Sequence, residues 1–151
     1  MKDFKKILVP VDGSRLSNLA FEHATSLARM VDGEVMVIHV IDPKSFGRIP
    51  YELSDIDNSK EVIENVRQHQ LEVMMKELVQ QGKKLGVKTA SKFLKGNIAN
   101  EIIKESSNYD LIIMGHLGQN ALSKLLMGSI AEKVSRHAKC SVMIVKEMGK
   151  N

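Results

Sequence analysis

The segment Leu111–Gly118, with the sequence LIIMGHLG, carries the strongest fold signal in the chain. It opens with an apolar run that contains two isoleucines and is bounded by Asp110 and Gly115. A short apolar run of this kind is typical of a strand that is buried on both faces of a sheet. The segment therefore predicts a central parallel strand that ends in a glycine-containing loop.

The loop after this strand holds glycines at a distinctive spacing. Gly115 and Gly118 stand three positions apart, and Gly128-Ser129 follows after nine further residues. Glycine lets a backbone turn tightly and approach a ligand without a Cβ, and successive N–H groups can form a concave anion site. The spacing matches neither a Walker loop nor the Gly-x-Gly-x-x-Gly of dinucleotide folds.

A helix is expected to begin at Ser129, because apolar residues recur from there at every fourth position. Its N-terminal N–H groups and its dipole would face the glycine loop, where they favour a phosphate. The same residues also fit a plain connection, because Ser129 and Glu132 have the spacing of a capping box. The residues alone leave both interpretations open.

Outward from this segment, apolar runs predict four more strands, at residues 6–11, 34–41, 87–94 and 142–146. Helical spacing fills the intervals between them, apart from a long polar loop at residues 42–59. Strands that alternate with helices predict an α/β fold, a doubly wound five-stranded parallel sheet with helices on both faces. We expect one domain, spanning residues 1–151.

Composition excludes several classes of protein. The 151 residues are 43% hydrophobic, as in a single globular domain, and the net charge of +4 suits an anionic ligand. Aromatic residues make up only 4% and the basic residues are dispersed, so a nucleic-acid surface is weakly supported. No apolar run approaches the roughly 20 residues of a membrane span, and the first residues do not form a signal peptide. We expect a cytoplasmic protein without membrane contact.

Cysteine and histidine spacing indicates no metal site. Cys140 is the only cysteine, which excludes an internal disulfide, and no two histidines are spaced to share a helix face. No nucleophile with an adjacent base stands out, so no catalytic residue is assigned.

Three motifs together resemble the universal stress protein family. They are Val9–Ser14 (VPVDGS), the glycine pattern described above, and Cys140–Val145 (CSVMIV), and the likeness spans nearly the whole chain. In that family the glycine pattern is associated with the ATP-binding branch. The resemblance implies the strand order 3-2-1-4-5, which places the reversal of winding between the first and fourth strands. Ligands of such sheets bind at the carboxyl ends of the strands that flank the reversal.

The resemblance also implies a set of nucleotide-binding residues. Val40 would offer backbone hydrogen bonds to adenine, Pro10 and Asp12 would line adenine and ribose, and the glycines with Ser129 would hold the phosphates. Asp12 has an alternative role as a turn residue that bonds its own backbone. The full set comprises Pro10, Val11, Asp12, Val40, Met114, Gly115, Leu117, Gly118, Gln119, Asn120, Gly128, Ser129 and Ile130.

This chain departs from the family's usual loop at two places. Gln119 and Asn120 stand where many ATP-binding members carry a basic residue and a hydroxyl, which implies weaker contact with the terminal phosphate. Lys124 is the nearest cation, with a solvated lysine as the alternative interpretation. His116 replaces a small hydroxyl residue and has no orienting partner in the sequence, so it is not assigned a catalytic role.

The resulting hypothesis is a stress-response regulatory protein that binds ATP, ADP or AMP, with Mg²⁺, and acts on a protein partner not identified by the sequence. The alternatives are a slow ATP-hydrolysing or autophosphorylating enzyme and an interaction module with an empty nucleotide crevice. The resemblance further implies a homodimer through the edge strand Val142–Val145, which is apolar and lacks the proline or charge that protects an edge.

Overall fold

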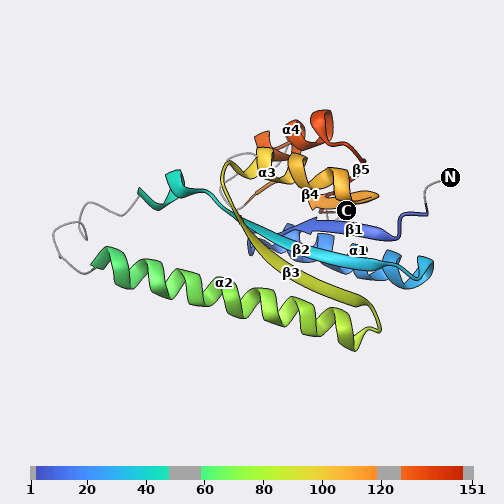
Figure 1. The fold of residues 1–151 in the computed structure, drawn as a ribbon, viewed down its shortest axis with the longest axis horizontal. Coiled ribbons are helices and arrows are strands. Elements are labelled where there is room, and N and C mark those ends of the chain that lie inside the picture. Colours follow the sequence, from blue (N-terminus) through green and yellow to red (C-terminus); the bar gives the residue numbers. More distant parts are fainter. Residues whose placement is uncertain (1–2, 48–58, 119–126, 148–151) are drawn as a thin grey trace.

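The computed structural model describes residues 3–47, 59–118 and 127–147. Five parallel strands form one sheet in the order β3-β2-β1-β4-β5 (Figure 1). The bounds are Lys6–Pro10 for β1, Glu34–Ile41 for β2, Lys88–Lys95 for β3, Leu111–Gly115 for β4 and Ser141–Val145 for β5. Each strand lies within one residue of its predicted position, and the strand order expected from the resemblance is confirmed.

Four α-helices connect the strands and cover both faces of the sheet (Figure 1). Their bounds are Arg15–Val31 for α1, Ser59–Lys84 for α2, Ile98–Glu105 for α3 and Ser129–His137 for α4. Within the described residues, two short 3-10 helices, η1 at Pro43–Gly47 and η3 at Ser106–Asn108, follow β2 and α3. Among the helices that the structure describes, none combines the length and the apolar composition that a membrane crossing requires.

Alternating strand residues divide the core into two layers. Ile7 and Val9 of β1 face the layer formed with α1 and α2, whereas Leu8 between them faces the layer formed with α3 and α4. All three side chains are fully buried, as the uninterrupted apolar runs predict for a sheet with helices on both faces. Burial of each such side chain contributes about 1.5–3 kcal/mol, so the sheet provides a rigid frame for the loops at its edges.

The helix ends follow local chemistry. The Ser14 hydroxyl accepts a hydrogen bond from the Ser17 N–H and caps α1, and the Asn97 side-chain oxygen Oδ1 accepts one from the Asn100 N–H and caps α3 as predicted. Asp32 ends α1 in the left-handed conformation, with φ of 53°. These caps fix where each helix begins relative to the strand before it.

Helix α2 packs closely on β3 through a glycine. A Cβ at Gly82 would overlap the Thr89 side chain, so only glycine allows this separation between the helix and the strand. The helix continues past Gly82 to Lys84.

Candidate functional site

The candidate site lies where the winding of the sheet reverses, between β1 and β4. These strands are paired only through Ile7 with Leu111 and Leu8 with Ile112, whereas β1 is paired with β2 along the whole length of β1. The carboxyl-terminal residues of β1 and β4 therefore lie beyond the paired region. In open α/β sheets, this reversal point is where ligands bind.

The turn after β1 is organised by Asp12. Its Oδ1 accepts a 2.9 Å hydrogen bond from the Ser14 N–H, and its own N–H donates to the Ser17 hydroxyl at 3.4 Å. Gly13 between them has φ of 82°, a conformation that side chains disfavour. The turn role considered for Asp12 is thus confirmed, and it orients the residues that lead into α1.

The β4 loop contacts this turn and the start of α1 through two glycines. A Cβ at Gly115 would lie 2.9 Å from the Leu16 Cβ, and a Cβ at Gly118 would lie 3.4 Å from Asp12 Oδ2. The absence of a side chain at Gly115 therefore permits the approach of α1, and Gly118 lies directly beside the Asp12 carboxylate. Segments from β1 and β4, about a hundred positions apart in the sequence, meet at this point.

Gly128 contacts the backbone at the start of the loop. Its N–H donates a 2.7 Å hydrogen bond to the His116 carbonyl oxygen, and a Cβ at this position would lie 3.2 Å from the same oxygen. In this conformation the Gly128 N–H is therefore committed to the loop. The glycine places the first turn of α4 against the backbone of residues 116–118.

Helix α4 begins at Ser129 as predicted, but the capping box is wrong. Gly128 is the N-cap, without a side-chain hydrogen bond, and its carbonyl oxygen accepts the Glu132 N–H at 2.9 Å. The Glu132 carboxylate pairs instead with Arg136, at 2.9 Å. The box fails because Ser129 lies one residue inside the helix, where its hydroxyl cannot reach the N–H three residues later. Ser129 is consequently exposed at the head of the helix.

His39, to which the sequence assigned no individual role, connects β2 to the site. Its Nδ1 lies 2.7 Å from the Val11 carbonyl oxygen, and because a carbonyl only accepts, this nitrogen carries the proton. The Val11 N–H donates to the Ile38 carbonyl oxygen at 2.8 Å, and the His39 ring contacts the Phe93 ring edge-on. A single histidine within an apolar strand gives no sequence signal for such a contact.

The expected site residues differ in their exposure. Val11, Val40 and Met114 are buried, whereas Gly118 and Ser129 are exposed. The other described residues of the set are partly buried, namely Pro10, Asp12, Gly115, Leu117, Gly128 and Ile130.

The structure describes only part of the glycine loop. Gln119, Asn120 and Lys124 lie outside the described residues. His116 is held against β5. Its backbone N–H donates to the Val145 carbonyl oxygen at 3.0 Å, and its side-chain Nδ1 lies 3.4 Å from the same oxygen.

Within residues 3–47, 59–118 and 127–147, no group of three or more His, Cys, Asp or Glu side chains is positioned for a metal ion.

Comparison with known proteins connects this arrangement to one family. The family model described as "Universal stress protein family" matches residues 3–146. A universal stress protein of Methanocaldococcus jannaschii is 36% identical over 146 residues, which cover 95% of this chain and 83% of the relative.

Solved structures share the fold over almost the full length. The protein MJ0577 superposes with a TM-score of 0.80 at 26% identity, covering 99% of this chain and 100% of that one. A universal stress protein solved in complex with cAMP has a TM-score of 0.67 at 18% identity, covering 95% of this chain and 97% of its own.

Proposed function

This chain belongs to the universal stress protein family, and we propose that it is a stress-response regulatory protein whose state depends on a bound adenine nucleotide. The observation that carries the proposal is the convergence of three segments at the reversal point of the sheet. The Asp12 turn, the Gly118 loop and the head of α4 contact one another there through Gly118 and Gly128. The proposed ligand class also agrees with the cAMP complex of one protein of the same fold.

The phosphates would bind at the head of α4. The Glu132 N–H is the first to bond back along the helix, so the N–H groups of Ser129, Ile130 and Ala131 precede the helical ladder. These groups and the helix dipole favour an anion, and the exposed Ser129 hydroxyl adds a further donor. Because the Gly128 N–H already donates to the His116 carbonyl oxygen, we assign Gly128 to that contact and not to the phosphates.

Adenine and ribose would lie toward β1 and β2. Val40 ends a buried stretch of β2 and would offer its backbone N–H and carbonyl to adenine, while Pro10, Val11 and Met114 provide apolar surface. Asp12 would line the ribose side, with its Oδ1 held by the Ser14 N–H. The His39 hydrogen bond to Val11 keeps the end of β1 fixed against β2.

Magnesium would be carried largely by the nucleotide. Mg²⁺ is commonly held by substrate phosphates with one or two carboxylates, so the site needs no complete protein cage. Asp12, beside Gly118, is the carboxylate of the described site that could reach it. Leu117, Gln119 and Asn120 would complete the phosphate loop without adding a positive charge.

We also propose that the protein forms a homodimer through β5. This strand is an edge of the sheet, and its Met143 side chain is 43% exposed, with Val142 and Ile144 partly exposed. An apolar edge presents unpaired backbone groups that a second copy can cover. Antiparallel pairing of two β5 strands about a two-fold axis would satisfy both edges.

Calorimetric titration with Mg-ATP tests the nucleotide proposal. The Ser129→Ala variant should bind ATP about threefold to tenfold more weakly, the effect of losing one hydrogen bond of about 0.5–1.5 kcal/mol. Ser135→Ala is the matched control, because Ser135 is also exposed on α4 but lies in its last turn. Wild-type protein that binds none of ATP, ADP or AMP would refute the proposal.

A further inference from the structure

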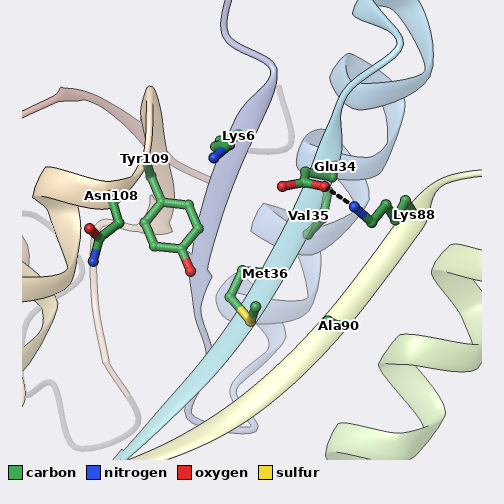
Figure 2. A pocket seen from close by; sticks show the side chains of 8 residues that line it. All are labelled: Lys6, Glu34, Val35, Met36, Lys88, Ala90, Asn108 and Tyr109. Carbon is green, nitrogen blue, oxygen red and sulfur yellow. Dashed lines mark hydrogen bonds and ion pairs between the residues drawn. The ribbon is translucent and has the colours of Figure 1, made fainter.

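A concave site lies at the amino-terminal edge of the sheet, at the opposite end of the strands from the glycine loop (Figure 2). We call it the amino-edge pocket. Its volume is about 270 Å³, and none of its residues belongs to the proposed nucleotide site. It is lined by Lys6, Glu34, Val35, Met36, Lys88, Ala90, Asn108 and Tyr109.

The pocket lies beside a small residue, Ala90, on the edge strand β3. Met36 and Ala90 are register partners on β2 and β3, and Ala90 is exposed on β3, which is an edge strand of the sheet. Met36 is only partly buried against the α3 and α4 layer of the core. Tyr109, which follows η3, forms the opposite wall, so apolar surface remains open between the strands and the tyrosine.

The charges around the pocket leave one ammonium group available. Lys88 pairs with Glu34 at 2.6 Å, and nearby Lys92 pairs with Glu105 at 2.6 Å. The Lys6 backbone N–H bonds the Asp110 carboxylate, but no ion pair of the Lys6 ammonium occurs among the described residues. The lining residues therefore carry a net positive charge, because they include two lysines and a single carboxylate, and that carboxylate is already paired with Lys88.

Tyr109 adds a hydrogen-bond donor. Figure 2 shows its ring extending from the α3 side toward β2, with the phenol oxygen directed toward Met36. The Tyr109 phenol is protonated at neutral pH at its usual pKa of 10.0, and burial raises the pKa further although the neighbouring Lys92 opposes that shift. A protonated phenol can donate to an anionic oxygen.

We propose that the amino-edge pocket binds a small aromatic monocarboxylate. The aromatic ring would pack on the Met36 thioether, the Ala90 methyl group and the Tyr109 ring, which are surfaces that favour aromatic contact. The carboxylate would pair with Lys6. Pockets for drug-sized ligands measure about 300–1,000 Å³, so this smaller one suits a single-ring molecule.

Amide chemical shifts measured by NMR on the full-length protein test this proposal, with sodium benzoate at millimolar concentration as the probe. Benzoate should shift the amides of Lys6, Met36, Ala90 and Tyr109, and the neutral analogue benzyl alcohol should shift them with lower affinity. Lys6→Met keeps the aliphatic length and should weaken benzoate binding by about fivefold, the upper end for an exposed ion pair. Lys104→Met, an exposed lysine on α3, is the control.

A second variant fills the pocket. Ala90→Leu should eliminate the benzoate shifts while the protein stays folded, because position 90 is exposed. Benzoate shifts absent from the wild type, equal for benzyl alcohol, or unchanged by Ala90→Leu would overturn the proposal. Ser129→Ala should bind benzoate as the wild type does, so this result is independent of the nucleotide proposal.

Discussion

The backbone N–H of Gly128 donates a 2.7 Å hydrogen bond to the carbonyl oxygen of His116. The missing side chain at Gly128 is part of the same contact, because a Cβ would lie 3.2 Å from that oxygen. The glycine is therefore required by the approach of two backbone segments. The nucleotide is proposed to interact with the residues that this approach positions, beginning with Ser129.

The Gly128 contact predicts a stability effect. Gly128→Ala should lower the free energy of unfolding by about 1–3 kcal/mol, as crowding of a packed site does. Gly118→Ala is the matched control and should lower it by less, because its Cβ would meet Asp12 at an ordinary 3.4 Å. Urea denaturation measures both values. Equal stability of the two variants would contradict the packing role of Gly128.

Gly82 provides a test of how closely α2 packs on β3. Alanine is the better helix former by about 1 kcal/mol, so propensity alone predicts that Gly82→Ala stabilises the protein. We expect destabilisation instead, because the new Cβ would overlap Thr89. Adding Thr89→Ala should recover part of the loss, and thermal melts of the single and double variants measure it. A Gly82→Ala variant more stable than the wild type would show that α2 is seated differently.

The proposed homodimer predicts that assembly is sensitive to a charge at Met143. Met143→Lys should give monomers in light scattering at micromolar concentration, because two-fold pairing of β5 would bring like charges together. Met30→Lys is the control, since Met30 is 82% exposed at the far end of α1. A wild-type protein that is itself monomeric would exclude the proposed assembly.

Alkaline pH should weaken the fold through Tyr109 and Lys92. Burial raises the pKa of Tyr109 above 10.0, and the hydrogen bond to Glu105 raises the pKa of Lys92 above 10.5. Both groups hold their protons more tightly when folded, so their contribution is complete below the unfolded pKa values and is lost as pH rises through the folded ones. In a Tyr51→Phe background, Tyr109 is the sole tyrosine, and its absorbance titration should have a midpoint above 10.0. A midpoint at or below that value would contradict the burial argument.

The sheet could be predicted from the sequence because its strands are short apolar runs, such as residues 111–114, which are typical of buried strands. Strand order could not be derived from periodicity, which is local, and it came instead from the family resemblance. The capping box of Ser129 was wrong by one residue, since the helix begins at Ser129 itself and Gly128 is its cap. Helix ends are decided by such single-residue shifts.

The contacts within the candidate site were partly beyond sequence reasoning. Asp12 and the glycines have recognisable turn chemistry, so their segments could be identified. The hydrogen bond from His39 to Val11 and the pocket wall at Tyr109 join residues far apart in the chain, with nothing in the intervening residues to indicate them. These contacts follow from strand register, which becomes visible only once the sheet is assembled.

The most direct test of the nucleotide proposal is the response of the backbone amides at the head of α4 to Mg-ATP. We predict that saturating Mg-ATP shifts the amide resonances of Ser129, Ile130 and Val40, and that the Lys6 and Ala90 amides at the opposite edge of the sheet respond least. AMP should shift Val40 as strongly as ATP does, because the two share adenine. Amides of Ser129, Ile130 and Val40 that stay unmoved at saturating ATP, ADP and AMP would contradict the account.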